Sequence, residues 1–504
     1  MRPRVEWERL LRDPRSHLGA LLALNLAWRI LFFTPYVNID LLDYLISARH
    51  LAEGTFPREN PFFAQNDHLV RYGVVLPLAL LKPLFGLGLG IVFLFGAAVS
   101  TTLLIVLHRL AWRWFGGPAA DFAGLLLVCL PFQEISLITG HAHLTGALLA
   151  LSSAGLFARA IEDSACGPRR WLGAGLLLGL AQVTVPATFL FVPAGVAWCL
   201  WERVGWRRGM WWFALGVGIV IGADVVFSGA WFGNPLFRYA ETQKTVAHWT
   251  PLGFSHVTLI QSFTEPFVPT TPMASCLGVV PWAGLAGMAL WLARRSRMGR
   301  FIALLWIVPF VLLRLIPYRL SPLEFLAPVT PHWAILPVPF LILAAGAGLG
   351  GLWEFRKSPA LAAGALAALV GVMESAAWSH DYGARAGIPS KRAYEWTRQG
   401  DDPLILDFVT RRHFFVFAGL DSDPRWLDVG EAQEGRGKGG RLVVIPTIWS
   451  DQGVQPPASL LETRAQWRLL AREEWPGRIR FRSLLKLTVE RTPPIRLEIY
   501  RIPE

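Results

Sequence analysis

The sequence predicts a mainly α-helical, polytopic membrane protein with about eleven transmembrane helices and a small α/β domain at its C-terminal end. Two features of the composition lead to this fold class: 53% of the 504 residues are hydrophobic, and only 17% are charged. A soluble chain of this length could not bury so much apolar surface, so the apolar runs are expected to cross a bilayer. A third observation predicts the second domain: after about residue 380, charge rises and apolar runs shorten to strand length.

The net charge is +12, and its distribution decides how it is interpreted. In a soluble protein this charge would suggest nucleic acid as a partner. Much of the arginine here stands in short runs between apolar segments, where basic residues mark the cytoplasmic ends of spans. We therefore expect membrane lipids, and no nucleic acid, among the partners.

The four cysteines lie in or beside apolar segments and have no metal-ligand spacing. The sequence therefore predicts neither a zinc site nor a disulfide framework.

The apolar runs and basic clusters together predict the topology. The first span, about 18–37, is expected to remain uncleaved, because no small-residue cleavage site follows it. With the N-terminus in the cytoplasm, every second loop is basic, as the positive-inside rule requires. The clusters contain Arg109 and Arg113, Arg159 and Arg169, Arg207 and Arg208, Arg294 to Arg300, and Arg356 with Lys357. We expect a multi-pass protein of a bacterial inner or cell membrane.

This topology puts three features on the outer face: the loops 37–72 and 229–273, and the chain beyond about residue 380. The 229–273 loop alternates aromatic and polar residues, so it could be a lid that contacts substrate or a purely structural cover. We therefore divide the chain into a transmembrane domain, 1–379, and a soluble extracytoplasmic α/β domain, 380–504. In the latter, the pattern predicts strands at 403–408, 441–446 and 495–502 and helices at 391–399 and 459–475.

Two carboxylates, Asp40 and Asp43, follow the first apolar run in the stretch Asn38–Gly54. A carboxylate at a membrane–water boundary can act as a general base when a substrate hydroxyl lies within hydrogen-bond reach. A helix over 43–53 would put Asp43 in its first turn, where an acid is favourable without any catalytic role. Asp40 could equally be a solvated loop acid.

The spacing Asp-x3-Tyr-x3-Ala-Arg-x4-Gly, formed by Asp40, Tyr44, Ala48, Arg49 and Gly54, resembles the first outer loop of the GT-C superfamily of integral-membrane glycosyltransferases. The likeness is to the branch that contains protein O-mannosyltransferases and the lipid A aminoarabinose transferase. In that family the loop typically begins with Asp-Glu, whereas Leu41 stands here in the second place.

Two further elements extend this resemblance. Arg71 and Pro77 resemble the Arg…Pro element before the next span, and FLAPVTP, 325–331, is similar to a late Phe-Leu-x-Pro-x-x-Pro element. In the family an arginine often precedes this late element, and here that place holds Glu324; Arg319, five residues earlier, could substitute or could simply face lipid headgroups. The likeness covers the first 110 residues and 318–350, and rests on topology alone between them.

The resemblance implies a GT-C-like fold and an enzyme of cell-envelope glycan biosynthesis that uses a polyprenyl-phosphate-linked sugar as donor. It implies a single inverting displacement with Asp40 as general base, supported by Asp43, and an arginine beside the departing phosphate. The acceptor could be a lipid, a protein or a glycan. The substrate-binding residues expected on this basis are Arg71, Tyr44, His143, Arg319, Glu324 and His68.

His141 and His143 follow the third span, near Glu134. A histidine here could position Asp40 or a substrate hydroxyl, or could bind a metal with carboxylate partners, so a divalent cation is a candidate cofactor. Interfacial polar residues without a catalytic role are the alternative.

Two other functions are considered. A transporter or flippase would show paired repeats and ionisable residues near mid-membrane, and the sequence shows neither. A catalytically silent scaffold subunit would agree with Leu41 and Glu324 at the two departures from the family pattern.

Overall fold

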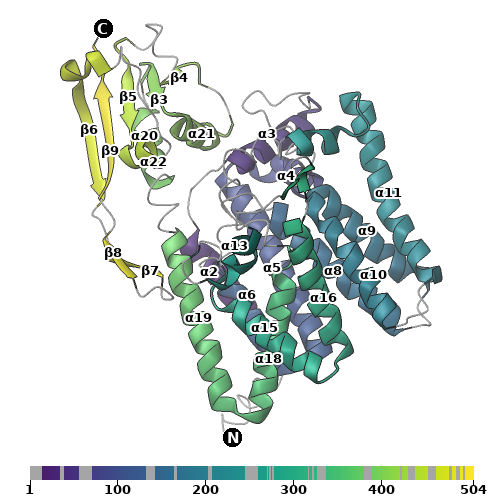
Figure 1. Ribbon diagram of the computed structural model, residues 1–504. Helices are drawn as coiled ribbons and strands as arrows, with labels where there is room; N and C mark the ends of the chain where they lie inside the picture. The colour runs from purple at the N-terminus through teal and green to yellow at the C-terminus, as the bar shows by residue number, and fades with distance from the viewer. Residues whose placement is uncertain are drawn as a thin grey trace, which may run out of the picture.

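The computed structural model contains a large helical domain and a small α/β domain beside it (Figure 1). It describes residues 14–33, 39–55, 71–131, 142–163, 167–202, 207–244, 259–268, 271, 274, 277–315, 317–320, 323–325, 336–379, 387–398, 400–420, 423–429, 438–451, 461–475, 479–483, 488–491 and 494–503.

The helical domain is built from long apolar helices, with shorter apolar helices packed among them (Figure 1). The elements are α2 (Pro14–Phe32), α3 (Ile39–Glu53), α4 (Tyr72–Phe85), α5 (Leu89–Phe115), α6 (Gly117–Val128), α8 (Ala142–Glu162), α9 (Pro168–Thr184), η2 (Pro186–Leu190), α10 (Phe191–Trp201), α11 (Arg207–Phe232), α13 (Leu259–Thr264), η3 (Glu265–Phe267), α15 (Val280–Ala293), α16 (Arg297–Leu315), the hairpin β1 (Pro317–Leu320) and β2 (Leu323–Phe325), α18 (Val338–Phe355) and α19 (Lys357–Ser379).

Six of the described helices are long and apolar enough to cross a membrane: α5, α8, α11, α16, α18 and α19. Other apolar helices, among them α4, α6 and α15, are shorter than the roughly 20 residues that a bilayer requires. The predicted polytopic, mainly α-helical membrane protein agrees with this composition, while the number of about eleven spans stays a prediction.

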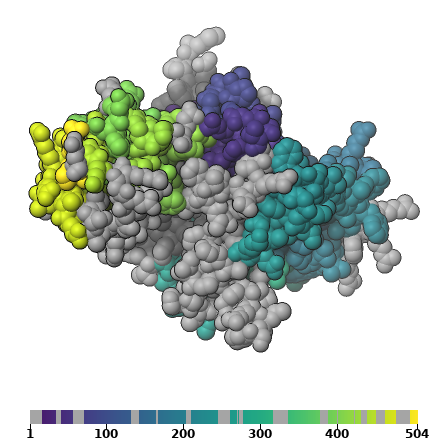
Figure 2. Space-filling model, turned by 90° about the horizontal axis from the view of Figure 1, so that it is seen from above, coloured from purple at the N-terminus to yellow at the C-terminus, as the bar shows by residue number. Residues whose placement is uncertain are grey.

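Parts of the three expected outer features lie at one end of the helical domain, whereas α13 of the 229–273 segment lies deeper in it (Figure 1). Figure 1 shows α3, the end of α11 and the C-terminal domain at the top, with the α18–α19 connection at the opposite end. Seen from above, α3 lies between the C-terminal domain and residues 207–244 (Figure 2). The orientation of this end in a membrane stays a prediction.

The helices approach one another closely where glycines face a neighbouring backbone. A Cβ atom on Gly216 of α11 would lie 2.4 Å from the carbonyl oxygen of Leu172 in α9, and one on Gly175 would lie 2.0 Å from that of Phe213. Small residues permit such contact between helices in membranes, where van der Waals packing replaces the hydrophobic effect.

Gly216→Ala is therefore expected to lower the free energy of unfolding by about 1–3 kcal/mol, because the methyl group meets backbone that cannot move aside. Thermal melting of the purified protein in detergent measures the effect. Gly218→Ala is the matched control, since nothing lies within 4 Å of a Cβ two residues further along α11. Equal melting temperatures for the two variants would contradict this packing.

The C-terminal domain contains a five-stranded sheet with the order β4-β3-β5-β9-β6. β3 pairs in parallel with β4 and β5, and β9 pairs antiparallel with β5 and β6. A separate two-stranded ribbon, β7–β8, follows β6. The elements are α20 (Ile388–Thr397), β3 (Leu404–Leu406), α21 (Phe408–Phe417), β4 (Trp426–Asp428), β5 (Arg441–Val444), α22 (Pro446–Asp451), η6 (Arg464–Gln466), β6 (Arg468–Trp475), β7 (Ile479–Ser483), β8 (Thr488–Arg491) and β9 (Ile495–Arg501).

Four of the five elements expected in this domain are present: strands at 403–408, 441–446 and 495–502 and a helix at 391–399. The helix expected over 459–475 was wrong, because Arg468–Trp475 forms the edge strand β6. This segment pairs with β9 from Arg468 opposite Arg501 to Trp475 opposite Ile495. Pairing with a distant strand outweighs the helix propensity of its Leu, Arg and Glu residues.

The two domains share a hydrophobic contact. Val416 at the end of α21 and Leu420 after it are 2% and 1% exposed, and both belong to the same buried cluster as Leu45 of α3. The C-terminal domain is therefore packed onto the helix that carries Asp40.

Candidate functional site

Helix α3 carries both candidate carboxylates. It begins at Ile39, four residues before the expected start at Asp43, so Asp40 lies in its first turn. Asp40 is partly exposed, whereas Asp43 is fully buried at 0%. Only the first of these carboxylates therefore lies where a substrate could reach it from the surface of the domain.

The residues around Asp40 explain the local structure. Leu41, which stands where the resemblance expects glutamate, is 1% exposed and belongs to the core of the helical domain. A carboxylate at that position would lose its hydration without a partner, which is costly. The hydroxyl of Ser47 donates to the backbone carbonyl of Asp43 at 2.6 Å.

Arg71 precedes α4 and reaches across to α3. Its Nη1 donates to the hydroxyl of Tyr44 at 2.9 Å, and its guanidinium carbon lies 5.9 Å from the centre of that ring. Tyr44 follows Asp40 by four residues, so the two side chains lie on the same face of α3. This contact brings a cation next to the helical face that carries the candidate base.

The sequence analysis did not predict a buried ion pair that lies beside the start of α4. Asp224 of α11 accepts from Nε and Nη2 of Arg238 at 2.9 Å each, and both side chains are 2% exposed. Nη1 of Arg238 donates to the carbonyl of Val183 at 2.7 Å, and its guanidinium carbon lies 4.9 Å from the ring centre of Tyr72. An acid inside an apolar run, GVGIVIGADVVFSG, was the available signal.

The pair holds Tyr72, the residue after Arg71, against α11 and the start of the 229–273 segment. A bidentate Arg–carboxylate pair has a fixed geometry. The first turn of α4 is therefore fixed from two sides, by Tyr44 and by Arg238.

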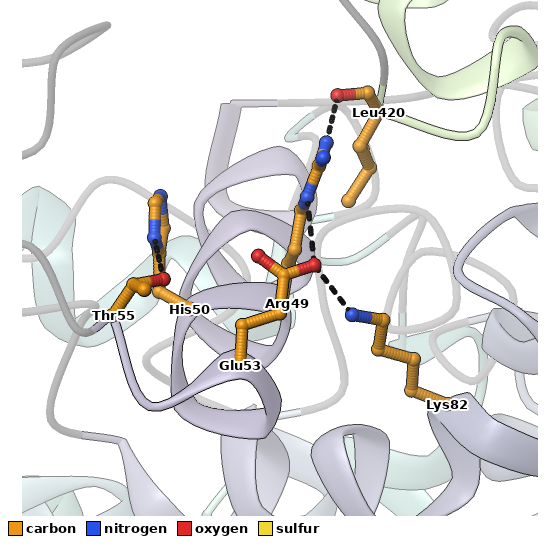
Figure 3. Close-up of polar contacts among 6 residues, drawn as sticks. All are labelled: Arg49, His50, Glu53, Thr55, Lys82 and Leu420. Carbon is orange, nitrogen blue, oxygen red and sulfur yellow. Dashed lines mark hydrogen bonds and ion pairs between the residues drawn. The ribbon is translucent and has the colours of Figure 1, made fainter.

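The opposite end of α3 contacts α4 and the C-terminal domain (Figure 3). Lys82 of α4 donates to Glu53 at 2.6 Å, and Nε of Arg49 donates to the same oxygen at 3.2 Å. Nη1 of Arg49 donates to the carbonyl of Leu420 at 2.5 Å. The hydrogen bond from Lys82 is the main reason that the pKa of Glu53 is lowered.

The carbonyl of Leu420 is presented by the turn that ends α21. Gly419 and Leu420 have φ angles of 72° and 71°, and the amide of Leu420 donates to the carbonyl of Phe415 at 2.8 Å. Arg49 therefore binds the turn that follows α21, close to the carbonyl end of this helix, where a cation is favourable.

Arg49→Ala is expected to loosen the C-terminal domain from α3, because it removes the described hydrogen bond to Leu420. The rate of limited proteolysis at the domain junction should rise several-fold, on the order expected for losing ~1 kcal/mol or more from one charge-assisted hydrogen bond.

Lys82→Ala is the control for this experiment, since it removes the ion pair with Glu53 but leaves the contact with Leu420 in place. The Glu53 side chain is 38% exposed, and such pairs stabilise proteins little. Equal cleavage of the two variants would refute the role of Arg49.

Several solved structures have a fold similar to that of this chain. ArnT from Cupriavidus metallidurans, determined with bound undecaprenyl phosphate, aligns over 95% of this chain and 97% of its own, with a TM-score of 0.55 and 16% identity. The Archaeoglobus fulgidus oligosaccharyltransferase tethered to an acceptor peptide aligns over 81% of this chain and 63% of its own, with a TM-score of 0.51 and 14% identity. The chain has the GT-C glycosyltransferase fold.

Two further comparisons extend this result. The arabinofuranosyltransferase AftD from Mycobacteria aligns over 97% of this chain and 40% of its own, with a TM-score of 0.50 and 16% identity. Residues 75–228 match the family model of dolichyl-phosphate-mannose-protein mannosyltransferases. No curated protein sequence matches the chain.

The expected GT-C likeness is thus confirmed, and the family match adds to it. The matched residues lie mainly between 110 and 318, where the resemblance rested on topology alone. The chain spans less than two thirds of the oligosaccharyltransferase and of AftD.

The residues just before the predicted late element form the β1–β2 hairpin, which ends at Phe325; 326–331 lie outside the described residues. The register of the hairpin places Arg319 opposite Glu324. The backbone therefore brings the arginine next to the place where the family pattern expects one.

The remaining candidates are only partly described. His143 is the second residue of α8 and is 9% exposed. His68, His141 and Glu134 lie outside the described residues. Within the described ranges, no three His, Cys, Asp or Glu side chains are grouped as metal ligands would be.

Proposed function

We propose that this chain is a glycosyltransferase that moves a sugar from a polyprenyl-phosphate-linked donor to an acceptor hydroxyl on the outer face of a membrane. One observation carries the proposal: Asp40 lies in the first turn of α3, one helical turn from Tyr44, and Arg71 donates to Tyr44. A carboxylate that can take a proton therefore lies one helical turn from the tyrosine that contacts Arg71, a cation that could hold a phosphate.

The proposed reaction is a single displacement. Asp40 takes the proton of the acceptor hydroxyl while its oxygen forms a bond to the anomeric carbon of the sugar. The bond from that carbon to the phosphate oxygen breaks, the lipid phosphate leaves with the electron pair, and the anomeric configuration inverts. Arg71 stabilises the charge that develops on the phosphate, because its planar donors match the phosphate oxygens.

Three findings support parts of this assignment. The fold is shared with an ArnT whose structure contains undecaprenyl phosphate and with an oligosaccharyltransferase tethered to an acceptor peptide. Arg319, brought opposite Glu324 in the hairpin, is a second candidate for the phosphate. The full burial of Asp43 favours a supporting role for it beneath Asp40.

Asp40→Asn is expected to reduce sugar transfer on the order of 10²–10⁴-fold, because the amide cannot accept the acceptor proton. Membranes that contain the protein are supplied with labelled polyprenyl-phosphate sugars, with and without a chelator of divalent cations, and product is counted. Glu53→Gln is the control on the same helix and should transfer normally. Equal labelling by wild type and Asp40→Asn would exclude Asp40 as the base.

A silent scaffold subunit makes a different prediction in the same assay. The wild type would then transfer no sugar from any donor tested, although it is folded and in the membrane.

Arg71→Ala is expected to raise the KM for the donor at least tenfold, since a hydrogen bond between charged groups contributes about 1.5–3 kcal/mol. Arg71→Lys should recover part of this loss because it restores the charge but not the planar fork. Lys82→Ala, at the other end of α4, is the control. An unchanged donor KM in Arg71→Ala would mean that another cation binds the phosphate.

A further inference from the structure

Glu265 and Arg314 are buried charged side chains of the helical domain, and each has a polar atom without a hydrogen-bond partner among the described residues. Glu265 opens η3, and Arg314 lies in the last turn of α16; they are 8% and 1% exposed. Oε2 of Glu265 and Nη2 of Arg314 are buried, and neither forms a hydrogen bond within the described part of the chain. Each of these charged groups therefore lacks one hydrogen bond within the described part of the chain.

The remaining contacts of both residues hold them in place. Nε of Arg314 donates to the carbonyl of Ser262 at 2.7 Å, and Nη1 donates to that of Phe310 at 3.0 Å. The guanidinium carbon lies 3.7 Å from the ring centre of Phe310. The backbone carbonyl of Glu265 accepts from the hydroxyl of Thr271 at 2.6 Å. The Arg314 guanidinium is thus held in place by its own contacts, and the backbone at Glu265 is held by Thr271.

The ion pair between Asp224 and Arg238, in the same domain, differs from Glu265 and Arg314. Those two side chains satisfy each other directly, whereas no ion pair between Glu265 and Arg314 occurs among the described residues. Burial raises the pKa of Glu265 to about 7, and the charge of Arg314 opposes this increase only in part. An open pair of this kind is costly unless a third group completes it.

The chemistry of the two atoms defines that group. A carboxylate oxygen needs a donor, and a guanidinium nitrogen needs an acceptor. A hydroxyl group supplies both, whereas a phosphate would only accept and would be repelled by the carboxylate. The surroundings of the guanidinium are apolar: it stacks on Phe310, whose ring also stacks on Trp306, and the ring centre of Phe263 lies 5.7 Å from the guanidinium carbon.

The position of Glu265 and Arg314 within the fold favours the donor sugar, rather than the acceptor, as the group that they bind. α16 leads directly into β1, which carries Arg319, one of the two candidate ligands of the donor phosphate. Figure 1 shows α13, which precedes Glu265, in the upper half of the helical domain, below α3 and α4. We infer that Glu265 and Arg314 bind a hydroxyl group of the donor sugar, an inference that rests on the proposed function.

The test measures binding rather than turnover, on the purified full-length protein. Undecaprenyl phosphate and its mannosyl and arabinosyl derivatives compete with a fluorescent undecaprenyl phosphate for the wild type, Glu265→Gln and Glu265→Leu. The wild type should prefer at least one sugar-bearing lipid over undecaprenyl phosphate. Glu265→Gln should reduce this preference about tenfold, because a charge-assisted hydrogen bond becomes a neutral one, and Glu265→Leu should abolish it.

Two controls separate the sugar from the rest of the lipid. Binding of undecaprenyl phosphate itself should stay within about twofold in both variants, since Glu265 is assigned only to the sugar. Glu241→Gln changes another buried acid, one already paired with Lys244 at 2.6 Å, and should keep the wild-type preference. If Glu265→Leu does not fold, Glu265→Gln decides, because the amide keeps the shape of the side chain.

The outcomes distinguish this inference from the proposed function. A wild type that does not bind undecaprenyl phosphate contradicts both. A wild type that binds it without preference for either sugar, or variants that keep the preference, overturn the inference alone. Variants with unchanged donor binding that raise the KM for the acceptor in the sugar-transfer assay also overturn it, and would assign the pair to the acceptor.

Discussion

The hydrogen bond between Arg71 and Tyr44 is the contact on which the proposed site depends. It joins the first turn of α4 to the face of α3 that carries Asp40, and Tyr44 is fully buried at the junction. Two parallel helices can present a carboxylate and a guanidinium to one substrate only if their starting turns are held at a fixed distance. The ion pair between Asp224 and Arg238 also holds the start of α4, because the guanidinium of Arg238 lies over the ring of Tyr72.

Buried charged side chains of the helical domain differ in whether their polar atoms all have hydrogen-bond partners. Asp224 and Arg238 form a closed, bidentate pair, which fixes structure and leaves nothing for a ligand to satisfy. Glu265 and Arg314 remain open, each with a buried polar atom unused among the described residues. Because desolvating a charge is costly, a closed pair indicates a structural role and an open pair indicates a place that a ligand completes.

The C-terminal domain is connected to the same helix as the candidate base. Arg49 belongs to the sequence pattern that resembles the GT-C superfamily, and in the structure it donates to the carbonyl of Leu420 in the turn after α21. Leu420 and Val416 add a buried apolar contact. A movement of this domain would therefore be transmitted to α3, the helix that carries Asp40.

The sequence by itself determined the fold class and the stretch that carries the site, because apolar length, basic clusters and the spacing from Asp40 to Arg49 are local properties of the chain. The same holds for the strands at 403–408, 441–446 and 495–502. The tertiary structure alone decided that Arg468–Trp475 is a strand and that α3 begins at Ile39, since each depends on packing against distant segments. It also decided which buried charges meet, because no local pattern records whether a buried pair is closed, as in Asp224 with Arg238, or open, as in Glu265 with Arg314.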